Sequence, residues 1–343
     1  MKTVEIVVPV YNEEEILPDF YKVVSGVADS LKNYRFSFIF VDDGSKDSSL
    51  SVLRYLAKDD HRVKYISFSR NFGKEAAIYA GLQNSSADMT ILMDADLQHP
   101  PALIPDMIHA VDSDECDACG AKRIPGRMSR LFTSLNNKLT TVKLQTGATD
   151  YMCMNRKFVN AVMSLSENQR FTKGLFAWVG FRVKWLDYVQ EARTKGKSKW
   201  NFFKLLSYAM DGITGFSVVP LKIVSFAGAI ICLLAIVYIL VTLIGTLVNG
   251  IDVPGYATTL VVMLFLGGII LLSVGVLGDY LGRIFMETKK RPIYIMNQTN
   301  MKMNQTRKSG EAASGQYRKN YPSADRKKTK EGKKEVKEKT INE

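Results

Sequence analysis

The sequence has few of the residues from which disulfides and zinc sites are built. Its 343 residues include four cysteines and three histidines. Cys116 and Cys119 form one C-x-x-C pair, and no second pair is present to complete a tetrahedral zinc site. The N-terminus shows no secretory signal and leads directly into a strand pattern. We therefore expect reduced thiols in a cytosolic domain rather than a disulfide framework.

Net positive charge is small outside the C-terminal part of the chain. The formal net charge is +12, but residues 283–343 alone contain 17 Lys and Arg against 7 Asp and Glu. All residues before them therefore carry a net charge of only +2. A nucleic-acid-binding domain needs a concentrated basic surface. We predict no nucleic-acid partner for the folded part of the chain.

Two long stretches lack charge altogether. Residues 223–251 and 253–278 contain no Asp, Glu, Lys or Arg. Each is longer than the ~20 apolar residues that cross ~30 Å of hydrocarbon as a helix. The pattern predicts a hairpin of two transmembrane helices, with spans at about 223–248 and 256–278.

Positive charges lie at the outer ends of this hairpin and not in its loop. Lys222 precedes the first span, and the short connection between the spans contains no Lys or Arg. Four basic residues follow the second span: Arg283, Lys289, Lys290 and Arg291. Because segments rich in Lys and Arg remain in the cytoplasm, we predict that both termini and the N-terminal domain are cytoplasmic.

The first 120 residues alternate short apolar runs with helical patterns. The expected strands are Val4–Val10, Phe36–Val41, Val63–Phe68, Thr90–Met93 and Asp117–Lys122. The expected helices are Glu13–Lys32, Asp47–Lys58, Lys74–Gln83 and Pro101–Val111. Such alternation is typical of a doubly wound, mostly parallel α/β sheet. Ligands bind these sheets beyond the carboxyl ends of the strands.

Polar clusters follow four of the predicted strands, at residues 11–13, 42–45, 69–71 and 94–96. In the last cluster Asp94 and Asp96 are two residues apart, so in an extended chain their side chains share a face and can converge. Two carboxylates at a strand end suit Mg²⁺ or Mn²⁺, which bind carboxylates together with phosphate oxygens. An isolated D-x-D is equally consistent with a solvated turn. Four clusters at one edge of a sheet favour a binding site.

The segment between this domain and the first span is less regular. Residues 150–154 have strand character, and residues 171–178 have a helical pattern. A basic loop at 193–200 leads into an amphipathic helix at 201–213. Next to a membrane span this combination predicts an interfacial element, and an ordinary surface helix is the alternative.

The chain after residue 298 loses its periodicity and becomes rich in Lys, Asn, Ser, Gly and Glu. With so little apolar surface, we expect residues 299–343 to form a disordered basic tail. Its basic run at 326–330 suits anionic lipid headgroups, and a purely solubilising tail is the alternative. The predicted organisation is thus a catalytic domain at 1–214, a membrane hairpin with a juxtamembrane segment at 215–298, and the tail.

Several ordered motifs resemble those of one known family. They are Val8–Glu14 (VPVYNEE), Val41–Ser45 (VDDGS), Met93–Pro101 (MDADLQHPP) and Arg193–Lys199 (RTKGKSK). They resemble glycosyltransferase family 2, and within it the dolichol-phosphate mannose synthase-like enzymes that glycosylate polyprenyl phosphates. Residues 278–294 are similar to the segment that follows the hairpin in the bacterial undecaprenyl-phosphate members. The resemblance covers residues 1–298 and implies a GT-A catalytic domain.

The resemblance also implies roles for individual residues. The residues expected to bind the nucleotide sugar are Pro9, Tyr11, Asn12, Glu13, Asp42 and Asp43. Those expected to bind Mg²⁺ or Mn²⁺ and the diphosphate are Asp94, Asp96 and Gln98. Those expected to hold the lipid phosphate and form the acceptor loop are Arg123, Arg130, Ser134, Arg193, Ser198 and Lys199. The expected catalytic residues are Asp94, Asp96 and Asp150.

The roles of Asp150 and His99 leave alternatives open. Asp150 corresponds to an acidic residue that acts either as a base or as an orienting group. A phosphate monoester has its second pKa near ~6, so the acceptor is already largely dianionic at neutral pH. We therefore predict that Asp150 orients the sugar or the basic loop. For His99 we favour a supporting or packing role over that of a third metal ligand.

The expected function is inverting transfer of one sugar from a nucleotide sugar, with UDP as the expected nucleotide, to undecaprenyl phosphate. The reaction would take place on the cytoplasmic face of the bacterial plasma membrane and supply cell-envelope glycans. One alternative is a processive polysaccharide synthase, although the sequence lacks a Q-x-x-R-W motif. The other is a non-catalytic membrane scaffold that retains the fold. Membrane lipids are expected partners, and a homo-oligomer is left open.

Overall fold

The structure is a computed structural model that describes residues 1–189, 214–215, 217–249 and 255–301. The chain divides into two units, Met1–Thr299 and Asn300–Glu343, and the fold below is that of the first. The predicted basic loop and interfacial helix lie outside the described residues. So does the predicted tail from residue 302 onward.

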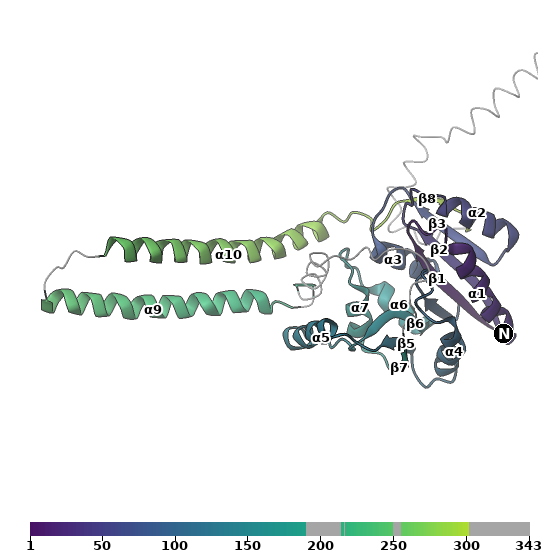
Figure 1. Ribbon diagram of the computed structural model, residues 1–343, viewed down its shortest axis with the longest axis horizontal. Helices are drawn as coiled ribbons and strands as arrows, with labels where there is room; N and C mark the ends of the chain where they lie inside the picture. The colour runs from purple at the N-terminus through teal and green to yellow at the C-terminus, as the bar shows by residue number, and fades with distance from the viewer. Residues whose placement is uncertain (190–213, 216, 250–254, 302–343) are drawn as a thin grey trace, which may run out of the picture. The chain divides into compact units, whose positions relative to one another are not determined.

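A mixed sheet of eight strands forms the centre of the N-terminal domain (Figure 1). The strands are β1 (Lys2–Val10), β2 (Tyr34–Asp42), β3 (Val63–Phe68), β4 (Met89–Leu92), β5 (Ala118–Arg123), β6 (Ala148–Asn155), β7 (Val183–Tyr188) and β8 (Met296–Thr299). Their spatial order is β7-β5-β6-β4-β1-β2-β3-β8. The neighbours β3, β2, β1 and β4 are parallel, whereas β6 is antiparallel to both β4 and β5. The predicted doubly wound, mostly parallel sheet is confirmed.

Helices cover both faces of this sheet. The helices of the N-terminal domain are α1 (Leu17–Ser30), α2 (Ser49–Asp59), α3 (Lys74–Asn84), α4 (Ile104–Asp112), α5 (Arg127–Leu139), α6 (Arg156–Ser164) and α7 (Thr172–Trp178), with a 3₁₀ turn at Pro101–Leu103. Along β1, Ile6 and Val8 join the core cluster with α1 and α4. Val7 points to the other face, toward α3. A Cβ at Gly81 of α3 would lie 2.2 Å from Val7 Cγ1, so only glycine permits this close approach.

The core strands follow the predicted runs closely because each is buried on both faces, as parallel strands generally are. Strand β3 has the predicted bounds, β1 begins two residues earlier and ends as predicted, and β2, β4 and β5 differ by one or two residues at each end. Helices α5 and α6 and strands β7 and β8 are additional elements that the sequence patterns do not predict.

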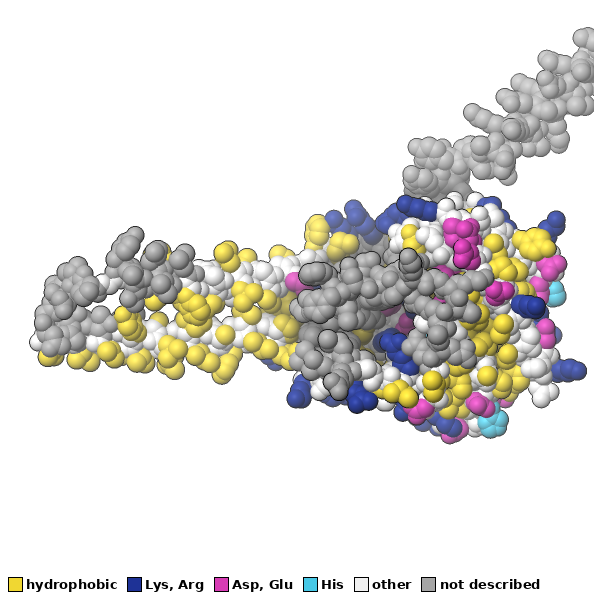
Figure 2. Space-filling model, in the orientation of Figure 1, with side chains coloured by type: hydrophobic (Ala, Val, Ile, Leu, Met, Phe, Trp, Pro, Cys, Tyr) yellow, Lys and Arg dark blue, Asp and Glu magenta, His cyan; other side chains and the backbone are white. Residues whose placement is uncertain are grey.

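Two long apolar helices follow, α9 (Val219–Asn249, 31 residues) and α10 (Tyr256–Thr288, 33 residues). Both are long and apolar enough to cross a membrane, and hydrophobic side chains line their outer surfaces (Figure 2). Helix α10 continues ten residues past the predicted end of its span. This extension carries charged residues, including the i, i+4 pair Asp279 and Arg283 at 3.5 Å. The helix therefore continues beyond the end of its apolar stretch.

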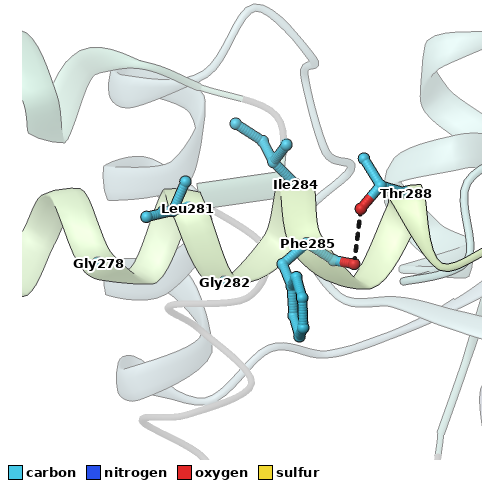
Figure 3. Close-up of a pocket in the computed structure, with 6 residues that line it drawn as sticks. All are labelled: Gly278, Leu281, Gly282, Ile284, Phe285 and Thr288. Atoms are coloured by element: carbon cyan, nitrogen blue, oxygen red, sulfur yellow. Dashed lines mark hydrogen bonds between the residues drawn. The ribbon is translucent and has the colours of Figure 1, made fainter.

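A shallow groove lies on this last part of α10 (Figure 3). It is lined by Gly278, Leu281, Gly282, Ile284, Phe285 and Thr288. The Thr288 hydroxyl donates a hydrogen bond of 3.0 Å to the Phe285 carbonyl one turn earlier. Because one helix supplies every lining residue, the groove is an open helix face rather than an enclosed binding site.

The chain returns to the central sheet after α10. The Glu287 carboxylate accepts the backbone N–H groups of Asn168 at 2.9 Å and Gln169 at 3.2 Å. The Tyr294 ring then stacks on Phe68 at 4.7 Å between centroids. Strand β8 pairs antiparallel with the edge strand β3. It includes Thr299, the residue at which the sequence pattern places the start of the tail.

Candidate active site

The loops after β1 and β2 are tied to each other by hydrogen bonds. The Asn12 backbone N–H donates to Ser45 Oγ at 2.9 Å, and Asn12 Oδ1 accepts the Lys46 N–H at 2.9 Å. Asn12 has a φ of 53°, in the left-handed region that Asn tolerates better than most residues. The predicted donor-binding residues at the end of β1 are Pro9, Tyr11, Asn12 and Glu13. Pro9 lies in the last part of β1, and the other three lie on the loop after it, which these hydrogen bonds hold to the loop after β2.

The Asp42 and Asp43 carboxylates, also predicted to bind the nucleotide, are buried and engaged with protein donors. Asp42 is 1% exposed and accepts the Ser45 N–H at 3.0 Å and the Ser67 hydroxyl at 2.7 Å. Asp43 is 3% exposed and accepts the N–H groups of Phe72 at 2.6 Å and Gly73 at 2.9 Å. These contacts order the ends of β2 and β3. A carboxylate has about four acceptor positions, so a direct bond to a nucleotide stays a prediction.

Burial raises the pKa of Asp43, and the Phe72 and Gly73 N–H groups oppose that shift. Next to it, Gly44 has a φ of +64° and its backbone passes close to β3. A Cβ at Gly44 would lie 2.3 Å from the Arg70 carbonyl carbon. Glycine is therefore required where these two strand ends meet.

The predicted D-x-D segment lies on a turn and not on an extended chain. Strand β4 ends at Leu92, two residues before Asp94, and Asp96 belongs to the turn that follows. Asp96 Oδ1 accepts the Gln98 N–H at 3.1 Å, and Leu97 has a φ of 55°. The prediction of an extended chain at Asp94 and Asp96 is thus wrong. An Asx-type turn, which aspartate favours, replaces the last strand residues.

His99 contacts this turn and the neighbouring strand β6. Its Nδ1 accepts the Asp94 backbone N–H at 3.3 Å, and its ring stacks on Tyr151 with centroids 5.1 Å apart. Only 6% of His99 is exposed, and this burial lowers its pKa. The contacts agree with the predicted supporting role rather than with a metal ligand.

A lysine joins the D-x-D turn to Asp150. The Lys74 Nζ lies 2.7 Å from Asp94 Oδ1, 2.8 Å from Asp94 Oδ2 and 2.7 Å from Asp150 Oδ2. The sheet register explains why these acids meet. Leu92 of β4 pairs with Met152 of the antiparallel β6, so two residues further on Asp94 comes opposite Asp150.

A second lysine flanks the same acid. The Lys173 Nζ lies 4.0 Å from Asp150 Oδ1 and donates to the Ala148 carbonyl at 3.2 Å. Burial disfavours ionisation of Asp150, but the charges of Lys74 and Lys173 outweigh it and hold the pKa of Asp150 well below its usual range. Burial likewise opposes the charge on Lys74, and Asp150 and Asp94 together raise its pKa.

The two lysines are positioned by one half-buried acid, Glu75. Glu75, next to Lys74 on α3, accepts the Thr172 backbone N–H at 3.0 Å and also the Thr172 hydroxyl. This contact joins the first turn of α3 to the first residue of α7, which places Lys173 beside Asp150. Burial, with a contribution from the charge of Asp150, raises the pKa of Glu75 to about 7.

The polar strand ends and the charged cluster thus lie at the carboxyl edge of one sheet. The chain is also similar in sequence to known proteins. Residues 5–165 match glycosyl transferase family 2, and residues 219–284 match the GtrB C-terminal hairpin. The "Bactoprenol glucosyl transferase" of Shigella phage SfV is 41% identical over 307 residues, covering 87% of this chain and 99% of the relative. The chain belongs to glycosyltransferase family 2.

A second relative aligns over a similar extent. The "Prophage bactoprenol glucosyl transferase homolog" of Escherichia coli (strain K12) is 40% identical over 301 residues, covering 85% of this chain and 98% of the relative. Among solved structures, glucosyl-3-phosphoglycerate synthase from Mycobacterium tuberculosis is 18% identical with a TM-score of 0.44, covering 62% of this chain and 78% of that one.

The donor atoms of the D-x-D turn fit a hard divalent cation. The described residues contain no group of three or more His, Cys, Asp and Glu side chains suited to a metal. The predicted set has two carboxylates and one amide, and Mg²⁺ and Mn²⁺ commonly complete their shells with phosphate oxygens and water. The Lys74 ammonium beside Asp94 shows that this position already holds a cation.

The residues predicted for the lipid phosphate are only partly placed by the structure. Arg123 is the last residue of β5 and is exposed. Arg130 and Ser134 are exposed and one turn apart on α5. Arg193, Ser198 and Lys199 lie outside the described residues. The assignment of all six to the acceptor stays a prediction.

Lys74, Glu75, Thr172 and Lys173 are site residues that the sequence patterns do not identify. A signal for Lys74 was present, since Gly73-Lys74 opens the helix that follows β3 after a loop at 69–73, and phosphate-binding residues often lie at such helix starts. Thr172 and Lys173 gave no local signal, because only the tertiary fold brings the start of α7 to β6.

Proposed function

We propose that this family 2 glycosyltransferase moves one sugar from a nucleotide sugar, UDP-linked, to undecaprenyl phosphate. The observation that carries the proposal is the Asp94–Lys74–Asp150 cluster at the carboxyl edge of the sheet. A site for an activated sugar needs positive and negative groups that can rearrange around a diphosphate. The cluster supplies both signs of charge where ligands of α/β sheets bind.

The hairpin supports a lipid acceptor. Helices α9 and α10 are apolar enough to cross a bilayer and are joined to the catalytic domain through Glu287 and β8. The relatives named for bactoprenol glucosyl transfer share this hairpin region within their aligned length. A polyprenyl phosphate bound next to such helices keeps its chain in the hydrocarbon and its phosphate at the headgroup level.

The chemistry requires a single displacement. A lipid phosphate oxygen attacks the anomeric carbon, the bond from that carbon to the diphosphate breaks, and the nucleoside diphosphate leaves with the bonding electrons. Attack from the face opposite the leaving group inverts the configuration at the anomeric carbon. Mg²⁺ or Mn²⁺, held by Asp94, Asp96 and Gln98, would supply charge compensation for the leaving diphosphate.

Asp150 acts in this scheme as an orienting group and not as a base. A carboxylate between Lys74 and Lys173, with its pKa held well below the usual range, is a weak proton acceptor. The acceptor phosphate does not need one, because it is already largely dianionic at pH 7. The catalytic contribution of the site is therefore positioning and electrostatic stabilisation.

The distribution of basic residues supports a cytoplasmic site. Lys222 and the group at 289–291 lie at the outer ends of the hairpin, and residues 250–254 between the helices contain no Lys or Arg. In this orientation the domain at 1–214 meets nucleotide sugars, which are made in the cytoplasm, and the product forms in the inner leaflet.

The proposal is tested with the full chain in detergent, undecaprenyl phosphate, Mn²⁺ and radiolabelled nucleotide sugars, beginning with UDP-glucose. A lipid product that carries a single sugar with inverted configuration supports it. A polymeric product would support a processive synthase instead. No product with any nucleotide sugar, from protein that remains folded, would support a non-catalytic scaffold.

A further inference from the structure

Lys74 occupies an unusual position for a lysine in a site that handles a divalent cation. Its ammonium group contacts both Asp94 oxygens and one Asp150 oxygen at 2.7 to 2.8 Å. Within the described part of the chain, no other basic side chain lies within ion-pair distance of Asp94. The ammonium group therefore uses the oxygen atoms that a metal ion at the D-x-D turn would need.

We propose that the Lys74 ammonium group pairs with Asp94 in the donor-free site. When the metal binds Asp94, this ammonium group leaves Asp94 and pairs with the donor diphosphate instead. The inference rests on the metal-assisted transfer proposed above. Two cations cannot share the same carboxylate oxygens at close range without strong repulsion. Metal binding at Asp94 therefore displaces Lys74, and an incoming diphosphate offers the displaced ammonium group new oxygen partners.

The backbone around Lys74 allows this exchange without a rearrangement of the fold. Asp43 accepts the N–H groups of Phe72 and Gly73, which fixes the chain just before Lys74. Lys74 is the first residue of α3, and Glu75 anchors the same turn to Thr172. The exchange then requires rotation of the lysine side chain alone, and such rotations of accessible side chains are fast.

The exposure of Lys74 separates this role from that of a structural ion pair. The Lys74 side chain is 45% exposed, compared with 27% for Asp94 and 17% for Asp150. A lysine so exposed contributes little to stability through its ion pairs. It can, however, leave its partners toward solvent, where the donor enters.

The test is a Mn²⁺ titration of the full chain in detergent, without donor, in which electron paramagnetic resonance reports free Mn²⁺. Lys74→Met removes the competing cation, so it should bind Mn²⁺ about tenfold more tightly than the wild type. It should also bind UDP in saturating Mn²⁺ several-fold more weakly, because the diphosphate has lost a cationic partner. Lys74→Arg retains the charge and should preserve UDP affinity.

The matched control is Lys184→Met. Lys184 is also an exposed lysine in an ion pair, 2.7 Å from Glu115, and lies on β7. Its loss should change neither Mn²⁺ nor UDP affinity. Lys74→Gln replaces Lys74→Met if the latter does not fold, and the same tightening of Mn²⁺ binding is expected.

Each outcome has a distinct meaning. Equal Mn²⁺ affinity in the wild type and in Lys74→Met or Lys74→Gln would overturn the exchange. Weaker Mn²⁺ binding in those variants would overturn it as well, since Lys74 would then support the metal. If the wild type binds no Mn²⁺ with or without UDP, the metal-assisted function itself fails, and the exchange fails with it.

Discussion

Two sets of carboxylates lie at the same edge of the sheet, and they are satisfied in different ways. Asp42 and Asp43 are almost fully buried and accept backbone N–H and hydroxyl groups. Asp94 and Asp150 are partly exposed and are held by the lysine Lys74. The backbone amides that bind Asp42 and Asp43 are held in place by the fold, whereas the Lys74 side chain can rotate away from Asp94 and Asp150. The first set therefore shapes the site, and the second set is available for exchange during the reaction.

The largest effect is expected at the second set. Asp94→Asn should lower turnover by on the order of 10³-fold, because the leaving diphosphate loses its charge compensation. The measurement is initial-rate formation of glycosylated lipid. Asp187→Asn, at an exposed carboxylate 3.5 Å from Lys122, is the control and should retain normal turnover. Turnover of Asp94→Asn within a factor of three of the wild type would mean that the two sets do not differ as described.

The first set should respond in stability instead. Asp43→Ala leaves the Phe72 and Gly73 N–H groups without their acceptor, which should cost about 2–3 kcal/mol of the free energy of unfolding. The measurement is the midpoint of thermal unfolding in detergent, with Asp187→Ala as the control. An unchanged midpoint with a large loss of UDP affinity would show that Asp43 acts mainly as a nucleotide ligand.

Asp150 should give an intermediate effect on activity. Asp150→Asn still presents an oxygen to Lys74 but loses the charge, so turnover should fall about tenfold, a barrier change of about 1.4 kcal/mol. The pH profile should retain its shape, without a new carboxylate limb. A loss as deep as that of Asp94→Asn, recovered as the pH rises, would identify Asp150 as the base.

The smallest effect is expected at Glu75 and depends on pH. Its pKa is raised to about 7 from 4.5, so the folded state binds its proton more tightly than the unfolded state does. The stability that this proton provides is full below pH 4.5 and is lost as the pH rises through 7.

Glu75→Gln retains an acceptor for Thr172 and carries no charge. The pKa shift alone corresponds to roughly 3 kcal/mol at pH 8. The amide is a weaker acceptor for Thr172 than the carboxylate, which offsets part of this gain, so the variant should be more stable than the wild type by about 1 kcal/mol at pH 8 and equal to it near pH 4.5. Thermal midpoints of both proteins at the two pH values measure this, and a difference that is the same at both would contradict it.

The sequence predicted those parts of the fold that follow from local burial. Strand β3 coincides with the apolar run Val63–Phe68, and the polar clusters do gather at the carboxyl edge of the sheet. The apolar stretches likewise predicted α9 and α10. Strand β8 could not be predicted, because its residues Met-Asn-Gln-Thr have no strand pattern. It forms because the edge of β3 offers backbone partners.

The site was predictable at the level of segments and not of contacts. The family motifs pointed to the D-x-D turn and to Asp150. Only the antiparallel register of β4 and β6 places Asp94 opposite Asp150. The bridging role of Lys74 depends on that register and on the loop held by Asp43, so no local pattern contains it.

The most direct measurement is the rate of lipid glycosylation by the full chain with and without excess chelator. We predict a single-sugar lipid product in Mg²⁺ or Mn²⁺, and loss of that product in excess EDTA with recovery when the metal is restored. The double variant Asp94→Ala, Asp96→Ala should be inactive in either condition. Glycosylation at the full rate in excess EDTA, or by the double variant, would contradict the account.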